Sequence, residues 1–293
     1  GGLYEWSEPE LANRGMGGSE IAAIKMAREI HNLTGRVVRV FNSRKDRVDC
    51  GGVIYEPVTS MNEYLSKCIP ALNIAWRHNI KITNAPTVLW CHDLWCPGIE
   101  NTVNYEKLAV LSPFHKNYVQ GLFNVPDDKI WITRNGVANA EKFKSADHKR
   151  AYKILYSSSP DRGLEHVIAA LDLVKEAGYM IELHVFYGID NMITMGKGAE
   201  AQKYLDLINK RHWITNHGNT LNTKLPDHYK DACIWLYPTN FQETFAITSL
   251  EMVLSGVYPI FRQYGALPDT LAEFTKKGMA ECHDKAPEDA AFW

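Results

Sequence analysis

The chain has 293 residues, which is enough for two domains that each bury a core of their own. An apolar content of 45%, a charged content of 23% and a net charge of −2 without lysine and arginine clusters indicate a globular protein with no nucleic-acid partner. The chain has six cysteines without metal-ligand spacing, no apolar run of transmembrane length and no signal peptide, so we expect a cytoplasmic protein with reduced thiols.

A glycine pair, Gly17-Gly18, precedes the first predicted helix. That helix has one apolar face, made by Ile21, Ile24, Ala27, Ile30 and Leu33. Without side chains, the pair lets the backbone approach a phosphate or a sugar closely, although a plain tight turn is the alternative. A nucleotide-binding domain normally begins with a strand, and residues 1–14 contain no convincing one. We therefore expect the first strand of the fold to be missing.

Apolar, β-rich runs alternate with loops and helical stretches in the first half, as in an α/β sheet. These runs are Val37–Phe41, Gly52–Tyr55, Leu72–Trp76, Thr87–Cys91, Leu108–Leu111 and Ile130–Arg134. His92 follows one of them, and the carboxyl end of a parallel strand is where such sheets bind ligands. The alternative is a structural histidine bonded to Asp93. The polar residues that follow predict a first domain over 1–140, a linker over 141–150 and a second domain over 151–293.

The second half opens with a strand over Lys153–Tyr156, a loop that contains Arg162-Gly163, and a helix. A cation at a helix N-terminus opposes the helix dipole unless an anion binds there too. We therefore interpret Arg162 as a phosphate ligand, because its fork suits paired oxygens. A surface ion pair with Asp161 or Glu165 is the alternative. A later strand over Ile181–Tyr187 ends at Gly188, a second point where the backbone can approach a ligand.

The stretch from Ile234 to Phe261 predicts a strand, a loop, a helix over Phe245–Leu254 and another strand. Two carboxylates, Glu243 and Glu251, lie eight residues apart in it, which along a helix is about 12 Å. Between them are the backbone N–H groups that open the helix and face an anion, those of Thr244, Phe245, Ala246, Ile247 and Thr248. This order of acid, phosphate cradle and acid suits a nucleoside diphosphate sugar.

The pair Glu243 and Glu251 forms an E-x7-E pattern that resembles the donor signature of retaining glycosyltransferases of the glycosyltransferase B fold, above all glycosyltransferase family 4. The resemblance implies an α/β fold with two Rossmann-like domains facing a cleft. Because the chain ends at Trp293, we expect the last helix of that fold to be missing as well. The resemblance also implies a hexosyltransferase that works without a cofactor. Such an enzyme moves a sugar from a UDP or GDP sugar to an acceptor, here unknown (a glycan, a lipid-linked sugar or a protein).

The resemblance also implies roles for single residues. Glu243 holds and orients the sugar, Glu251 binds the ribose, and Arg162 takes the place of a family lysine, while Ser157 stands where the family has an arginine. His92 contacts the sugar from the first domain. The implied catalytic residues are thus Glu243, Arg162 and His92. The implied donor-binding residues are Gly17, Gly18, Gly188, Gly218, Thr244, Phe245, Ala246, Ile247, Thr248 and Glu251, of which Gly218 belongs to a turn beside the base.

Other functions remain open. The sequence has no D-x-D pair, so we expect no metal in the reaction, and it has no G-x-G-x-x-G after a first strand, which argues against a nicotinamide dehydrogenase. A sugar-nucleotide epimerase or a phosphorylase of the same fold would bind the same donor. A catalytically silent nucleotide-sugar-binding module is also compatible with the sequence, as is peripheral contact with a membrane.

Overall fold

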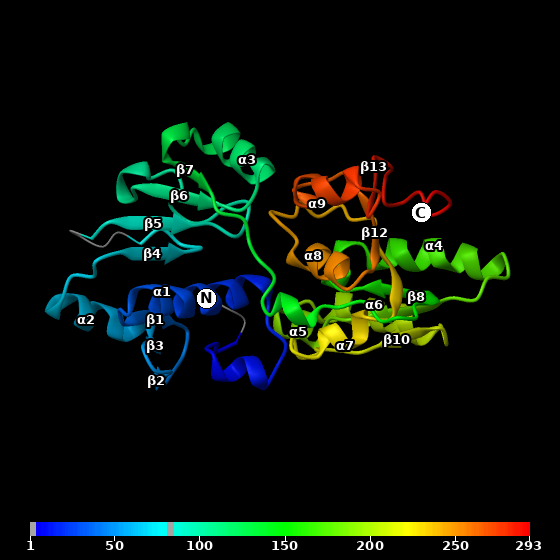
Figure 1. The fold of residues 1–293 in the computed structure, drawn as a ribbon, viewed down its shortest axis with the longest axis horizontal. Helices are drawn as coiled ribbons and strands as arrows, with labels where there is room; N and C mark the ends of the chain where they lie inside the picture. Colours follow the sequence, from blue (N-terminus) through cyan, green and yellow to red (C-terminus); the bar gives the residue numbers. More distant parts are fainter. Residues whose placement is uncertain (1–3, 81–84) are drawn as a thin grey trace. The chain divides into compact units, whose positions relative to one another are not determined.

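The structure is a computed structural model that describes residues 4–80 and 85–293. The chain divides into two compact units: unit 1 ends at Ala138, and unit 2 begins at Asn139. Figure 1 follows their elements along the chain. None of the helices formed by the described residues combines the length and the apolar character that crossing a bilayer requires.

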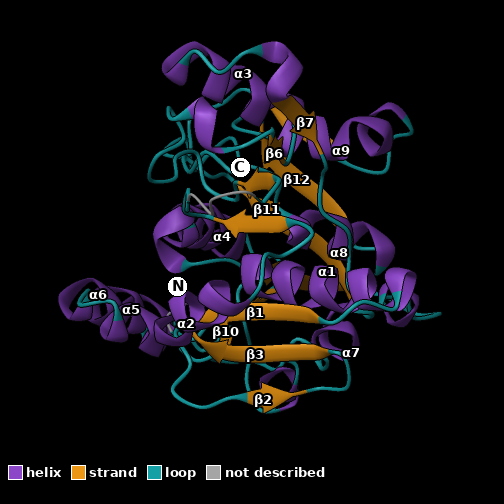
Figure 2. Cartoon of the chain, turned by 90° about the vertical axis from the view of Figure 1, so that its left-hand side faces the viewer, coloured by secondary structure: helices purple, strands orange, loops and turns teal. Residues whose placement is uncertain are grey.

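Unit 1 contains two sheets and three α-helices among its described residues. The first sheet has the order β1-β3-β2, with β1 parallel to β3, and helix α1 lies along these strands (Figure 2). The second is a parallel sheet of order β4-β5-β6-β7. The elements are α1 (Gly18–Thr34), β1 (Val38–Asn42), β2 (Val48–Asp49), β3 (Val53–Pro57), α2 (Met61–Lys67), β4 (Asn73–Trp76), β5 (Thr87–Trp90), β6 (Lys107–Val110), α3 (Pro113–Phe123) and β7 (Ile130–Ile132).

Local signals in the sequence explain how these elements begin and end. The hydroxyl oxygen of Ser112 accepts a hydrogen bond from the backbone N–H of His115, and Pro113 occupies the first position of α3. Helix α3 ends at Phe123 and is capped by Asn124, whose φ of 50° reverses the chain. Unit 1 therefore has the strand and helix rhythm that its sequence predicts, with β2 and α2 as additions.

Unit 2 is a single parallel six-stranded sheet of order β10-β9-β8-β11-β12-β13 with helices in its crossovers. Its elements are β8 (Arg150–Tyr156), α4 (Leu164–Glu176), β9 (Glu182–Val185), α5 (Ile189–Thr194), α6 (Gly198–Asn209), β10 (Ile214–Asn216), α7 (Leu225–Tyr229), β11 (Ala232–Tyr237), α8 (Ile247–Leu254), β12 (Tyr258–Arg262), α9 (Leu267–Lys276) and β13 (Glu281–His283). From β8 the chain builds the sheet outward on one side, then returns to build the other side from β11. The strand order therefore reverses between β8 and β11, and ligands bind such sheets outside the strand ends at this point.

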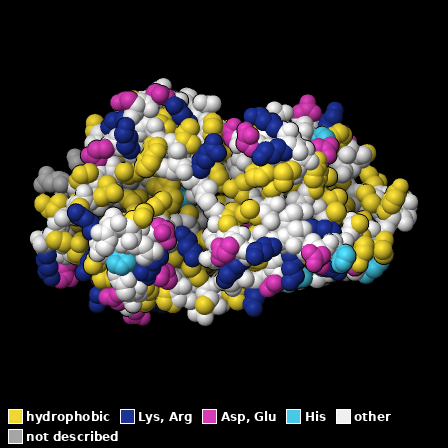
Figure 3. All heavy atoms as spheres, in the orientation of Figure 1, with side chains coloured by type: hydrophobic (Ala, Val, Ile, Leu, Met, Phe, Trp, Pro, Cys, Tyr) yellow, Lys and Arg dark blue, Asp and Glu magenta, His cyan; other side chains and the backbone are white. Residues whose placement is uncertain are grey.

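On the face drawn in Figure 3, basic and acidic side chains of the described residues are interspersed over each unit. The described residues form several surface ion pairs, such as Lys67 with Glu63 and Lys276 with Glu273. Exposed pairs of this kind contribute little to stability. This distribution agrees with the small net charge of the sequence.

Candidate functional site

The loops that follow β8 and β11 meet at the switch point of the unit 2 sheet. The first contains Arg162, at the end of a 3-10 turn over Pro160–Arg162, and the second contains Glu243. Gly163 has a φ of +119°, and a Cβ there would lie 3.0 Å from the carbonyl oxygen of Pro238. Glycine therefore allows both the backbone conformation and the close approach of the two loops.

Arg162 forms an ion pair with Glu243, not with its sequence neighbours. Its Nη1 donates to Oε1 of Glu243 at 3.0 Å, and its guanidinium lies 3.8 Å from the ring centre of Phe241. Burial disfavours the charge on Arg162, but the carboxylate of Glu243 outweighs this effect and raises its pKa. Asp161 binds Lys197 at 2.6 Å and Glu165 binds Lys203, so the predicted alternative of a pair with either acid is wrong.

The backbone of Glu243 is held from the loop after β12. The N–H of Ala266 donates to the carbonyl oxygen of Glu243 at 2.8 Å. Gly265 has a φ of +59°, and a Cβ there would lie 2.7 Å from the backbone nitrogen of Glu243. The Glu243 side chain is largely buried, with 9% of the residue exposed. Its position is therefore fixed by main chain as well as by Arg162.

Helix α8 begins at Ile247, two residues later than the sequence predicts. The reason is Ala246, which has a φ of 64° and a ψ of 71°, the left-handed conformation that costs a non-glycine residue about 1 kcal/mol or more. The N–H groups of residues 245–248 have no hydrogen-bond partner within the described part of the chain. Free N–H groups at a helix N-terminus attract an anion. Of the predicted cradle, Phe245, Ala246, Ile247 and Thr248 thus retain free amides, while Thr244 has an interaction of its own.

Glu251 lies in the second turn of α8, one helix turn beyond the free amides. Burial raises the pKa of its carboxyl group to about 7. Its carboxylate also raises the pKa of Tyr229, after burial of that tyrosine itself. No hydrogen bond or ion pair of the Glu251 side chain is formed within residues 4–80 and 85–293. It is a half-buried acid available to a ligand.

Two serine–tyrosine pairs lie in the same part of unit 2, and the sequence did not reveal them. The hydroxyl oxygens of Ser157 and Tyr229 lie 2.5 Å apart, and those of Ser158 and Tyr237 lie 3.0 Å apart. The hydroxyl of Tyr237 also donates to Oε1 of Glu243 at 2.7 Å. Ser157, the position where the family resemblance implies an arginine, therefore bonds a buried tyrosine. No local sequence signal predicts pairs whose members lie 72 and 79 residues apart.

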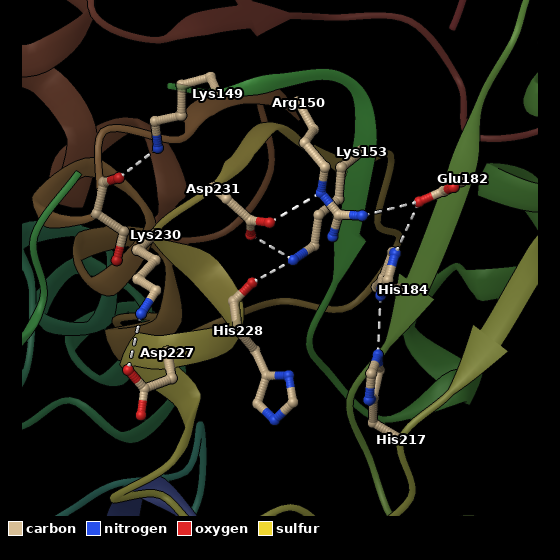
Figure 4. Close-up of polar contacts among 11 residues, drawn as sticks. Lys149, Arg150, Lys153, Glu182, His184, His217, Asp227, His228, Lys230 and Asp231 are labelled. Atoms are coloured by element: carbon tan, nitrogen blue, oxygen red, sulfur yellow. Dashed lines mark hydrogen bonds and ion pairs between the residues drawn. The ribbon is translucent and has the colours of Figure 1, made fainter. Parts of the chain in front are cut away.

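Gly188 and Gly218 follow β9 and β10, at the carboxyl edge of the same sheet. Next to Gly218, the ring of His217 stacks on Phe186, with ring centres 4.4 Å apart and planes within 4°. Figure 4 shows His217 and His184 pointing toward each other, with Nε2 and Nδ1 joined at 2.8 Å. Burial and the neighbouring His184 and His228 lower the pKa of His217 to about 4. The predicted turn beside the base thus carries a cluster of neutral histidines, of which His184 is buried and His217 and His228 are half-buried.

An ionic network anchors α7 beside this cluster (Figure 4). Lys153, which is 3% exposed, donates to Oδ1 of Asp231 at 2.5 Å and to the carbonyl oxygen of His228 at 2.7 Å. Arg150 binds the other oxygen of Asp231 at 2.8 Å. Because Asp231 satisfies the buried ammonium of Lys153, this network is structural.

The predicted residues of unit 1 lie at the start of α1 and after β5. Gly17 is the N-cap residue of α1, and Gly18 is its first residue. His92 is 7% exposed, and burial, followed by the positive charge of Arg77, lowers its pKa to about 3. The carboxylate of Asp93 accepts a hydrogen bond from Nε of Arg77 at 2.6 Å. Contact of these residues with a donor stays a prediction.

Within the described residues, no group of three or more His, Cys, Asp or Glu side chains is arranged to hold a metal ion. The arrangement in unit 2 is instead a set of free amides and one arginine, flanked by the buried Glu243 and the half-buried Glu251. Fixed positive potential of this kind can bind a diphosphate, and the acids can accept hydrogen bonds from hydroxyl groups.

Comparison with known proteins finds similarity in sequence and in structure. No family model matches the chain. Glycogen synthase of Flavobacterium johnsoniae is 24% identical over 239 residues, which cover 75% of this chain. The chain spans 48% of the length of that relative.

The structure resembles several solved glycosyltransferases along nearly the whole chain. Sucrose-phosphate synthase from Thermosynechococcus elongatus matches with a TM-score of 0.71 at 15% identity, over 94% of this chain and 82% of its own. WaaG, a glycosyltransferase involved in lipopolysaccharide biosynthesis, matches with a TM-score of 0.69 at 12% identity, over 94% of this chain and 86% of its own. Anabaena HepE in complex with UDP-glucose matches with a TM-score of 0.69 at 13% identity, over 94% of this chain and 85% of its own. The predicted fold is confirmed: this chain has the glycosyltransferase B fold.

Proposed function

We propose that the protein is a glycosyltransferase that moves a sugar from a nucleoside diphosphate sugar to an acceptor hydroxyl group. The observation that carries the proposal is the convergence of Arg162 and Glu243 beside the free amides of residues 245–248. Arginine and helix N-termini are both preferred ligands of diphosphates. The UDP-glucose complex of HepE supports a uridine nucleotide as the first donor to test.

In the proposed complex, the diphosphate lies on the N-terminus of α8, and Arg162 binds its oxygens. Glu251, one helix turn further on, binds the ribose, and Glu243 binds sugar hydroxyls. The turns at Gly188 and Gly218 lie beside the base. In this arrangement Glu243, in the loop before α8, and Glu251, in its second turn, lie on either side of the free amides along the chain.

The proposed reaction breaks the bond between the anomeric carbon and the diphosphate oxygen. The positive charge of Arg162 and the amides of α8 stabilise the negative charge that develops on the leaving diphosphate. The developing oxocarbenium character of the sugar favours a nearby carboxylate, a role that we assign to Glu243. The acceptor oxygen forms the new bond, and its proton passes to a leaving phosphate oxygen. The resemblance of the E-x7-E pattern to retaining enzymes supports retention without a metal ion.

Donor hydrolysis tests this proposal. The intact chain is incubated with UDP-, GDP- and ADP-glucose, and released nucleoside diphosphate is measured with and without a chelator. We expect release from one of them by the wild-type protein, and we expect Glu243→Ala and Arg162→Ala to lose it. A nucleotide sugar that binds tightly but is never hydrolysed to the nucleoside diphosphate would instead indicate a silent binding module. Interconversion of the sugar without diphosphate release would indicate an epimerase.

A further inference from the structure

The carboxylate of Glu243 is held on one side only. Its Oε1 accepts two hydrogen bonds, from Nη1 of Arg162 at 3.0 Å and from the hydroxyl of Tyr237 at 2.7 Å. Its Oε2 has no hydrogen-bond partner among the described residues. Two donors on one oxygen fix the plane of the carboxylate and leave the other oxygen as a free acceptor.

The hydroxyl groups of Tyr237 and Ser158 donate their hydrogen bonds in one direction, toward Glu243. An ionised carboxylate only accepts, so the hydroxyl proton of Tyr237 points to Glu243. The oxygen of that hydroxyl then accepts from Oγ of Ser158, 3.0 Å away. Burial, followed by the charge of Glu243, raises the pKa of Tyr237, which keeps its hydroxyl protonated as a donor. Such a chain of hydrogen bonds strengthens each of its members.

The ring of Tyr237 is also fixed. The residue is 1% exposed and closes β11, where it pairs with Phe261 of β12. Its ring stacks on Trp235, with centres 4.7 Å apart and planes within 21°. A buried, stacked ring at the end of a central strand is a rigid platform, so its hydroxyl defines where Oε1 of Glu243 lies.

We propose that Tyr237, supported by Ser158, is a positioning residue that aims the free oxygen of Glu243 at the hydroxyl groups of the donor sugar. This inference rests on the proposed function and adds a residue outside the E-x7-E pattern. It makes a specific claim: Tyr237 serves recognition of the sugar, whereas the diphosphate is bound by Arg162 and the amides of α8. Loss of the Tyr237 hydroxyl should therefore separate sugar recognition from nucleotide binding.

Tyr237→Phe removes only the hydroxyl. We measure binding of UDP, GDP and ADP and of their glucose derivatives, and donor hydrolysis with the derivative that binds best. For Tyr237→Phe we expect roughly ten-fold weaker binding and slower hydrolysis of the nucleotide sugar, because hydrogen bonds to charged groups have about that effect. We expect the affinity for the free nucleoside diphosphate to stay within about two-fold of the wild type. Ser158→Ala should show the same pattern with a smaller change.

Two controls isolate positioning from stability. Tyr105→Phe also removes a buried hydroxyl, which donates to the carbonyl oxygen of Ile99 at 2.6 Å in unit 1, and should leave hydrolysis unchanged. Tyr237→Phe introduced into Glu243→Ala should cause no further loss of sugar recognition, since its effect acts through that carboxylate.

The outcomes separate the two proposals. If the wild type binds one of these nucleotides and Tyr237→Phe behaves like Tyr105→Phe, or weakens nucleotide and nucleotide sugar equally, the positioning role is wrong. Additive losses in the double variant would also overturn it. If the wild type binds none of the six compounds, the proposed function fails, and the positioning role fails with it.

Discussion

Arg162 and Glu243 lie 81 residues apart in the sequence and are joined by a hydrogen bond of 3.0 Å at the switch point of the unit 2 sheet. Their side chains are 33% and 12% exposed. The pair therefore links the loops after β8 and β11 in surroundings where an unpartnered charge is costly. In the proposed complex, the same two groups also divide the donor between them, Arg162 at the diphosphate and Glu243 at the sugar.

The first prediction concerns stability of this pair. Glu243→Ala leaves the guanidinium of Arg162 without its carboxylate, so we expect the free energy of unfolding to fall by roughly 1–3 kcal/mol, discounted for partial exposure. Urea unfolding measures the loss. Glu273→Ala, which breaks an exposed pair with Lys276, is the control and should leave stability nearly unchanged. Equal effects of both variants would contradict the role of the pair.

The second prediction concerns Gly265. A Cβ at this position would lie 2.7 Å from the nitrogen and 2.9 Å from the oxygen of Glu243, so Gly265→Ala must displace that backbone. We expect both stability and donor hydrolysis to fall. Gly278 has a similar φ of +68° but nothing within 4 Å of its Cβ position. Gly278→Ala should therefore cost only the backbone strain, about 1 kcal/mol, and leave hydrolysis unchanged. If the two variants hydrolyse the donor equally, Gly265 does not position Glu243.

The third prediction uses the pKa of Glu251, which burial raises from 4.5 to about 7. The folded state thus binds the proton more tightly than the unfolded state, so this residue contributes stability at low pH that is lost as pH rises through about 7. Glu251→Gln should stabilise the protein by up to roughly 3 kcal/mol at about pH 8 and change it little at about pH 4.5. Urea unfolding at both pH values tests this, with the exposed Glu176→Gln as the control. A pH-independent effect would contradict it.

The fourth prediction concerns His217, whose contribution to stability depends on pH in the opposite direction. The pKa of His217 is lowered to about 4, so the unfolded state binds more protons between that value and the ordinary pKa of 6.5. Stability should fall as the pH falls through this window. His217→Gln should remove roughly 1–3 kcal/mol of this acid-dependent loss, whereas the exposed His212→Gln should leave it unchanged. The free energy of unfolding is measured across this pH window. If it falls equally in the wild type, His217→Gln and His212→Gln, the acid-dependent loss does not come from His217.

The sequence predicts those parts of the site that depend on neighbours in the chain. Periodicity and spacing in the sequence predict the two acids, Glu243 and Glu251, and the helix that contains Glu251. They also predict that a helix begins after Arg162-Gly163. The helix nevertheless begins at Ile247. Nothing in the residues Thr-Phe-Ala signals that Ala246 takes a left-handed conformation, because tertiary contacts, not its own preference, determine it.

The remaining parts of the site depend on contacts between distant segments. Arg162 had plausible partners in Asp161 and Glu165, and only the fold shows that Lys197 and Lys203 occupy those acids. The hydrogen bond from Tyr237 to Glu243 joins residues that are six apart in the sequence, whereas the hydrogen bond between Ser158 and Tyr237 joins residues that are 79 apart. The short strands β10 and β13 were also missed, since three residues carry too little periodicity.

A crystal structure of the protein with the nucleoside diphosphate that binds best tests the central claim most directly. We predict phosphate oxygens within about 2.7–3.2 Å of the N–H groups of Ile247 and Thr248, and of the Arg162 guanidinium, with the ribose at Glu251. A bound nucleotide whose phosphates lie elsewhere, with these amides still free, would contradict the account.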